Sequence, residues 1–165
     1  MVNKGVPRKK RKLVVKPLIG WQEFCSLPDL GLPVIKAKID SGAKTSALHA
    51  YDIKPFTKDG EKYVRFKVQP LQRNKLAVEC VAKLVEKRYV ISSNGEREKR
   101  YVINTTIALG GRSFPAELTL TSRHKMAFRM LLGRGALRKA KVAIDPAKSY
   151  LMGKKEESVE IYRNP

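Results

Sequence analysis

Apolar and polar side chains alternate through much of the chain. The segment EKYVRFKV, which begins at Glu61, sets Val64, Phe66 and Val68 against charged neighbours, and LAVECVAKLV, which begins at Leu76, repeats the period of two. Successive side chains of a β-strand point to opposite faces. The alternation therefore predicts strands that bury one face and expose the other.

Short turn-forming segments separate the predicted strands. They are PDLG at 28–31, KDG at 58–60, SSNG at 92–95 and LGG at 109–111, and Asp-Gly and Asn-Gly pairs are strong signals for tight hairpins. The one helical candidate is GALRKAK at 135–141. We therefore expect an all-β domain, arranged as a closed barrel or sandwich, with one short helix near its C-terminus.

The length and charge of the chain limit its organisation and its partners. With 165 residues, the chain is expected to form one domain, which we place at residues 17–153, between a disordered basic arm at 1–16 and a C-terminal polar tail at 154–165. Lys and Arg number 35 and Asp and Glu number 15, which gives a net charge of +20. Such a charge favours an acidic partner: nucleic acid, an anionic membrane surface or an acidic polypeptide.

The basic arm contains an uninterrupted run of cations. A run of this kind can bind RNA or the ribosome through phosphate contacts, or it can remain a solvated tail. The sequence leaves both interpretations open. The residues of the run are Arg8, Lys9, Lys10, Arg11 and Lys12.

Cysteine usage and the N-terminal residues indicate a compartment. Cys25 and Cys80 lie far apart in apolar surroundings and form no CxxC pair, which is typical of a reduced, cytoplasmic protein rather than a disulfide scaffold. The apolar stretch LVVKPLIGW is interrupted by Lys16 and Pro17, so it is too short for a signal peptide core or a membrane span. We expect a cytoplasmic protein with no membrane partner.

Few residues could support metal, nucleotide or serine-hydrolase chemistry. His49 and His124 are the only histidines, and the sequence has neither an HExxH segment nor a cysteine pair, so it predicts no metal site. Neither of the common glycine-rich phosphate motifs occurs, and we expect no cofactor. Ser46 and His49 could belong to a serine-hydrolase triad, but no nucleophile elbow accompanies them.

One carboxylate stands at the end of a predicted strand. The segment VIKAKI leads into Asp40, Ser41 and Gly42, which supply a carboxylate, a hydroxyl and a residue that permits a sharp turn. Far downstream, FRMLLGRGAL places an apolar pair and Gly133 before the predicted helix. The two segments together favour a catalytic role for Asp40 over that of a simple turn residue.

The segments DSGA at 40–43 and LLGR at 131–134 resemble, in the same order, the two segments that build the active site of retropepsin-like aspartic proteases. More closely, WQEFCSLPDLGLPVIKAKIDSGAKTSALHA, SSNG and MLLGRGAL are similar to a bacterial family labelled as ATP-dependent zinc proteases. Members of that family often accompany, or are fused to, a ribosomal-protein glutamate ligase. The resemblance covers residues 18–153 and implies a retropepsin-like closed barrel with one lobe per chain.

The resemblance also implies an aspartic endopeptidase. Two carboxylates share one proton in such a site, and one Asp-Ser-Gly segment supplies only one Asp40 per chain. The second Asp40 is therefore expected from a symmetric partner in a homodimer. Ser41 would link the two turns, Gly42 would let the backbone approach the substrate, and Ala43 would pack beneath.

Substrate-binding residues are implied beside the turn and at a hairpin tip. The SSNG hairpin would close over the peptide as a flap, although an ordinary exposed hairpin carries the same signals. The candidate substrate-binding residues are Ala43, Lys44, Thr45, Ser92, Ser93, Asn94, Gly95 and Arg134.

The residues after the turn depart from the retroviral pattern. Retroviral proteases carry acidic residues there, one of which pairs with the arginine of the second segment, whereas this chain has Lys44 and Thr45. Lys44 and Arg134 would then be two cations near the cleft without this ion pair. They favour an acidic substrate, such as a Glu-rich tail on a ribosomal protein. Alternatively, Lys44 points to solvent and Arg134 bonds backbone carbonyls.

Two other functions are compatible with the sequence. A zinc-dependent hydrolase would use His49, His124 and Asp40 as metal ligands. A non-catalytic RNA- or ribosome-binding module would use the same fold together with the basic arm.

Overall fold

The computed structural model describes residues 5–92, 94–122 and 127–164. Its strands are β1 (Leu18–Ile19), β2 (Gln22–Leu27), β3 (Leu32–Ile39), β4 (Ser46–His49), β5 (Tyr51–Lys58), β6 (Glu61–Val68), β7 (Val78–Ile91), β8 (Arg97–Leu109), β9 (Arg112–Thr121), β10 (Met130–Leu132) and β11 (Ala143–Ile144). Its helices are a 3₁₀ turn (Pro28–Leu30), α1 (Arg134–Ala140) and α2 (Val159–Arg163).

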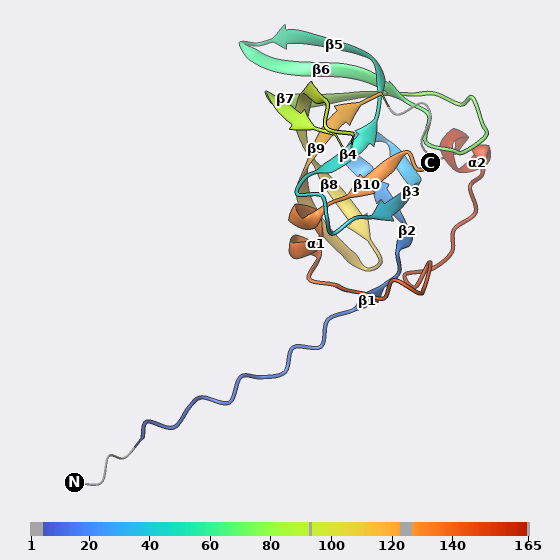
Figure 1. The fold of residues 1–165 in the computed structure, drawn as a ribbon. Coiled ribbons are helices and arrows are strands. Elements are labelled where there is room, and N and C mark those ends of the chain that lie inside the picture. The colour runs from blue at the N-terminus through green and yellow to red at the C-terminus, as the bar shows by residue number, and fades with distance from the viewer. Residues whose placement is uncertain (1–4, 93, 123–126, 165) are drawn as a thin grey trace.

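Nine strands form one curved sheet in the order β2-β3-β10-β4-β9-β8-β7-β6-β5. A second pairing, between Ser26 of β2 and Ala108 of β8, closes the first six of these strands on themselves. The remaining strands, β7, β6 and β5, continue past the closure and form the upper layer in Figure 1. The predicted all-β fold is confirmed, but the sheet is not a clean barrel because one end of it extends beyond the closed part.

The alternation in the sequence corresponds to the two faces of the sheet. On β6, Val64, Phe66 and Val68 are fully buried, while Arg65 between them is exposed. On β7, Cys80 is buried and its neighbours are exposed. The buried faces of the closed part and of β6 and β7 meet in one hydrophobic core.

The predicted turns connect the strands as expected. Asp59 and Gly60, with φ angles of 51° and 77°, join β5 to β6, and positive φ at both central residues is the geometry of a tight hairpin turn. The SSNG and LGG segments lie between β7 and β8 and between β8 and β9. The PDLG segment forms the 3₁₀ turn, which ends at Gly31 with a φ of 69°.

The predicted helix at 135–141 forms as α1, one residue earlier at each end. Its buried side chains, Ala136, Leu137 and Ala140, pack towards the sheet. Lys141 ends it in the left-handed conformation with a φ of 54°.

The segment at 154–165 includes α2, which the sequence did not predict. Tyr162 of α2 lies against β3, where its hydroxyl donates a hydrogen bond to the carbonyl of Val34 and accepts one from the Val34 N–H at 3.3 Å. Burial raises the pKa of Tyr162 to about 12. The phenol therefore stays protonated at neutral pH and can donate this bond.

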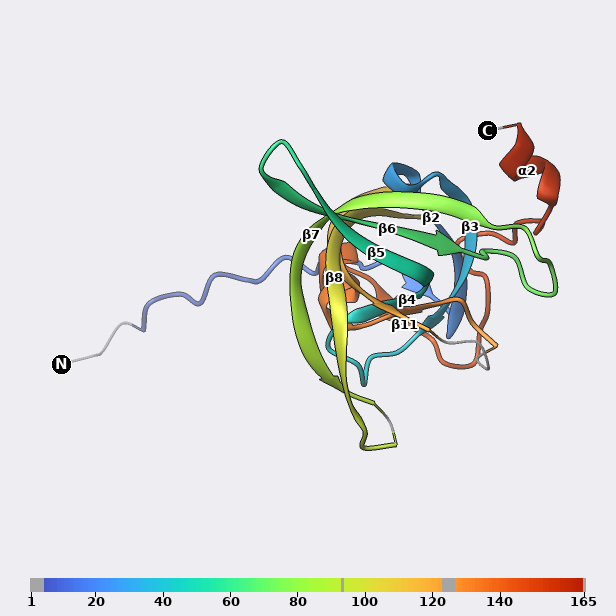
Figure 2. The same cartoon turned by 90° about the horizontal axis from the view of Figure 1, so that it is seen from above.

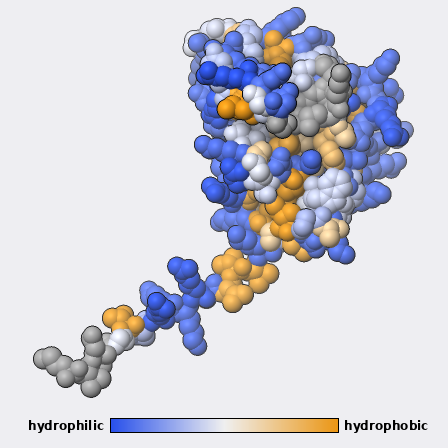
Figure 3. Space-filling view, in the orientation of Figure 1, coloured by the Kyte–Doolittle hydropathy of each residue, from blue (hydrophilic) through white to orange (hydrophobic). Residues whose placement is uncertain are grey.

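The described part of the arm, residues 5–16, forms neither helix nor strand and extends away from the domain in Figure 1. In Figure 3 this segment carries both hydrophilic and hydrophobic stretches. Leu13, Val14 and Val15, which follow the basic run, are 94%, 77% and 86% exposed. No helix in the described residues is long and apolar enough to span a membrane.

Both cysteines are buried and unbridged. Burial raises the pKa of Cys25 and of Cys80 to about 12, so both thiols are protonated at neutral pH.

Candidate active site

Strand β10 places two distant segments of the chain side by side. It lies between β3 and β4, parallel to β3 and antiparallel to β4, and Leu132 is in register with Ile39. The N–H of Asp40 donates a hydrogen bond to the carbonyl of Leu132 at 2.9 Å. Asp40 and Gly133 therefore leave the sheet at the same edge, as the two sequence motifs led us to expect.

Asp40 holds its own turn. The N–H of Gly42 donates to Asp40 Oδ1 at 2.9 Å, and the N–H of Ala43 donates to the Asp40 carbonyl at 3.3 Å. A Cβ atom at position 42 would lie 3.1 Å from the same carboxylate oxygen, so Gly42 leaves room for this bond. Since the Gly42 N–H holds Oδ1 in place, Asp40 is both a turn residue and an oriented carboxylate.

Arg134 fastens α1 to the turn. Its Nη1 donates to the carbonyls of Ser41 and Gly42, both at 2.9 Å. Its backbone N–H donates to the carbonyl of Ala43 at 2.7 Å. Arg134 therefore bonds backbone carbonyls, which is the alternative interpretation given for it from the sequence. A direct contact between Arg134 and a substrate stays a prediction.

Gly133 allows this close approach. A Cβ atom at position 133 would lie 2.8 Å from the carbonyl oxygen of Ala43 and 2.9 Å from backbone atoms of Thr45. Its N–H donates to Ser46 Oγ at 3.0 Å. Ser46 is thus a buried structural residue rather than a nucleophile, and His49, further along β4, is also fully buried.

A cleft of about 1710 Å³ opens over the turn. Its floor includes the turn and parts of β4, β9 and β10, and its sides are α1 and the β7–β8 hairpin. The predicted site residues that line it are Asp40, Gly42, Ala43, Lys44, Thr45, Ser92, Asn94 and Arg134. Ser41 and Gly95 do not line it, and Ser93 lies outside the described residues.

The β7–β8 hairpin is long and projects beyond the other strands in Figure 2. Its tip closes through the Ser92 N–H, which donates to the Glu96 carbonyl at 2.8 Å, and through a hydrogen bond between Ser92 Oγ and Asn94 Oδ1. The tip and Asp40 line the same cleft. Movement of the hairpin as a flap stays a prediction.

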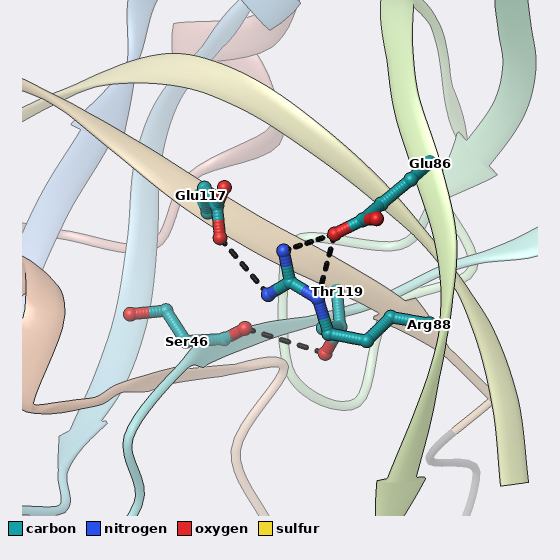
Figure 4. A network of polar contacts seen from close by, with 5 residues as sticks. All are labelled: Ser46, Glu86, Arg88, Glu117 and Thr119. Atoms are coloured by element: carbon teal, nitrogen blue, oxygen red, sulfur yellow. Dashed lines mark hydrogen bonds and ion pairs between the residues drawn. The ribbon is translucent and has the colours of Figure 1, made fainter.

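Sequence reasoning missed Arg88, which lies on the hairpin side of the cleft (Figure 4). Its Nε donates to Glu86 Oε1 at 2.8 Å and its Nη1 donates to Glu117 Oε2 at 3.0 Å. These bonds, and the one to Glu117 most of all, raise the pKa of Arg88 above the already high value of an ordinary arginine. Glu86 lies two residues from Arg88, which is a weak local signal, whereas Glu117 reaches Arg88 from β9 only through the fold.

The proposed zinc ligands are only partly described. His49 is buried in β4, Asp40 lies in the turn, and His124 is outside the described residues. Within the described part of the chain, no three His, Cys, Asp or Glu side chains gather in an arrangement that could hold a metal ion.

Known proteins share this sequence and fold. The model of the RimB-like family, described as retropepsin-like aspartic endopeptidase RimB, matches residues 18–155. A curated relative named "Probable alpha-L-glutamate ligase", from Shewanella pealeana, is 49% identical over 141 residues, which is 85% of this chain and 31% of that protein. A protein of the same name from Desulfotalea psychrophila is 45% identical over 85% of this chain and 30% of its own length. The chain thus spans about a third of these relatives.

A solved structure, that of the protein Lpg0085 of unknown function from Legionella pneumophila, is also similar. It has a TM-score of 0.69 and 30% identity, and the match covers 84% of this chain and 99% of the other. The similarity therefore extends over nearly the whole of a separately solved chain.

Proposed function

The chain belongs to the RimB-like family of retropepsin-like aspartic endopeptidases, and from this premise we propose that it hydrolyses peptide bonds with water activated at Asp40. One observation carries the proposal: the Asp40 carboxylate is fixed by the Gly42 N–H, on a turn joined to β10 and α1, inside a large open cleft. A fixed acid at a cleft floor is the arrangement that aspartic hydrolysis requires.

A second carboxylate must share the proton with Asp40, because two like charges about 3 Å apart do not both ionise easily. Among the described residues, the other carboxylates that line the cleft belong to Glu96, Glu98 and Glu117. Glu98 and Glu117 are already paired, with Arg100 and with Arg88, at 3.0 Å each. Glu96 lies in the loop between β7 and β8 rather than on the Asp40 turn. Because each chain has one Asp-Ser-Gly turn, we assign the second carboxylate to Asp40 of a second copy of the chain, related by a two-fold axis that passes between the two turns.

In this homodimer the ionised Asp40 takes a proton from the water, whose oxygen attacks the peptide carbonyl carbon. The protonated Asp40 donates its proton to the carbonyl oxygen. The C–N bond then breaks as the nitrogen takes up a proton from the dyad, and one acid and one amine leave. Ser41 would bridge the two turns, and the hairpin tip would cover the bound peptide and exclude water.

An acidic polypeptide is the proposed substrate. The net charge of +20 favours it, and Lys44 is exposed in the cleft beside Asp40. The curated relatives carry the name glutamate ligase, which suggests that glutamate polymers occur near such proteins. A glutamate tail on a ribosomal protein would be negatively charged, opposite to the chain, and would consist of the amino acid in the relatives' name.

Cleavage of tailed and untailed ribosomal protein, followed by mass spectrometry, tests the function. We expect loss of glutamate from the tailed protein alone, and Asp40→Asn should lower the rate by about 10²–10⁴-fold while the mass by light scattering stays that of a dimer. Full activity of Asp40→Asn would contradict the aspartic mechanism. Inhibition by a chelator, reversed by zinc, would instead favour the zinc-dependent alternative.

The basic arm supports a second function, binding of RNA or the ribosome. Its run from Arg8 to Lys12 is exposed and lies away from the domain in Figure 1. Replacing the five cations by Gln should weaken RNA binding in a gel shift and reduce the salt slope by roughly one for each lost phosphate contact. Unchanged RNA binding would show that the arm does not contribute to it.

A further inference from the structure

Three cations on one side of the cleft have no counter-charge. Lys44 follows the catalytic turn, and Arg138 and Lys139 lie on α1; all three are exposed and line the cleft that holds Asp40. The described residues form no ion pair with any of them. Their ammonium and guanidinium groups are therefore available to an incoming anion.

The backbone fixes these cations relative to Asp40. The N–H groups of Arg134 and Gly135 donate to the carbonyls of Ala43 and Lys44 at 2.7 and 3.0 Å, which joins the first turn of α1 to the catalytic turn. Beneath the helix, Ala136, Leu137 and Ala140 are buried. The opposite face of α1 is thereby held towards the cleft.

The spacing along α1 suits an extended peptide. Arg138 lies four residues after Arg134, on the same face and about 6 Å further along the helix axis. Arg134 itself is bound to the turn beside Asp40. Alternate side chains of an extended peptide are about 7 Å apart. A peptide that crosses Asp40 can thus bring a second side chain to Arg138.

The described cations that line the hairpin side of the cleft each contact a carboxylate or an aromatic ring, unlike Arg138 and Lys139 on α1. Arg88 is held by Glu86 and Glu117, and Arg100 by Glu98. Arg97 stacks on the ring of Tyr89, 3.9 Å from its centroid. An acidic ligand would meet carboxylates as well as cations on that side, so its charge favours the α1 side.

We propose that Lys44, Arg138 and Lys139 form an acidic-residue subsite that binds side-chain carboxylates of a peptide lying across Asp40. The inference rests on the proposed function, because it assumes that the cleft takes a peptide. The subsite acts in binding and not in bond cleavage, so its removal should raise KM for acidic peptides far more than it lowers kcat. A phosphate backbone is a less suitable occupant because the cations adjoin the catalytic turn, where a peptide must bind.

Binding of a fluorescent hexaglutamate peptide to full-length Asp40→Asn protein tests the subsite without cleavage. Each exposed ion pair contributes a few-fold to affinity, so adding Arg138→Gln and Lys139→Gln should weaken binding by about tenfold. The matched control is Lys141→Gln, which removes a cation that follows α1 but does not line the cleft. The control should bind hexaglutamate with the same affinity as the parent protein. The affinity for hexaglutamine should not change with any of the three substitutions.

Charge reversal gives a readout that a merely structural role would not change. In the Asp40→Asn background, Arg138→Glu with Lys139→Glu should bind hexalysine more tightly than the parent does. Equal affinity of the parent and the Gln variant for hexaglutamate would overturn the subsite, as would an oligonucleotide of equal charge that binds tighter with the same dependence on Arg138 and Lys139. Failure of the proposed function is a separate result, namely wild-type protein that cleaves no acidic peptide.

Discussion

The two sides of the cleft carry similar cations that differ in whether a carboxylate pairs with them. On the α1 side, Lys44, Arg138 and Lys139 have no carboxylate partner among the described residues. On the hairpin side, Arg88 and Arg100 are engaged by glutamates at 3.0 Å or less. A count of basic residues treats the two sides as equal. Among the described residues, ion pairs neutralise Arg88 and Arg100 on the hairpin side but none of the three cations on the α1 side. This difference is the basis for placing an acidic ligand on the α1 side.

Gly133→Ala should have the largest effect, because it separates the α1 side from the catalytic turn. The added Cβ would meet backbone atoms of Ala43 and Thr45 at 2.8 and 2.9 Å, and these atoms cannot move without shifting the turn. We expect the free energy of unfolding, measured in urea, to fall by about 1–3 kcal/mol, with loss of peptidase activity. Gly111→Ala is the matched control, since a Cβ there meets nothing within 4 Å; equal losses in both variants would contradict the argument.

Arg134→Lys should have an intermediate effect. Lysine keeps the charge but cannot reproduce the guanidinium contacts to two carbonyls, so the unfolding free energy should fall by about 1 kcal/mol. Activity should fall as the Asp40 turn loosens. Arg138→Lys is the matched control, one helical turn away. Among the described residues no carbonyl accepts a hydrogen bond from the Arg138 guanidinium, so the unfolding free energy should change by no more than about 0.5 kcal/mol. A fully active Arg134→Lys protein would show that the bonds of Arg134 do not position Asp40.

Arg88→Gln should have the smallest effect on stability, at most about 1 kcal/mol, because its ion pairs are largely exposed. It frees Glu117 in the cleft, so affinity for hexaglutamate should drop a few-fold at low salt and recover at high salt. The double variant Arg88→Gln with Glu117→Gln removes both charges and should restore low-salt affinity. If the double variant bound as weakly as the single one, the proposed compensation on the hairpin side would be wrong.

Local patterns in the sequence predicted the features that depend on near neighbours. The alternation at Val64, Phe66 and Val68 marked a strand because each side chain faces its own side of the sheet, and Asp59-Gly60 marked a hairpin because that pair tolerates positive φ. Helix α1 begins and ends one residue before the predicted bounds, because Gly133 is its N-cap residue and Arg134 therefore its first helical residue.

Features that join distant segments were harder to predict. The pairing of the Asp40 turn with the segment at 131–134 came from resemblance to a family, not from spacing. No local pattern indicates that Tyr162 packs on β3, that β2 also pairs with β8, or that Glu117 binds Arg88. The state of each cation in the cleft depends on such contacts. Composition therefore supports a prediction about the sign of the substrate's charge, which stays a prediction, but gives none about where the substrate binds.

The insertion of β10 between β3 and β4 also has a consequence for folding. The bond from Arg134 to Ser41 joins residues 93 positions apart, so loop closure over most of the domain must precede it. A nascent chain therefore carries the Asp40 turn long before it can fix that turn in place. This delay in contact formation would leave the proposed active site of a newly made chain unassembled on the ribosome until nearly all of the sheet has formed.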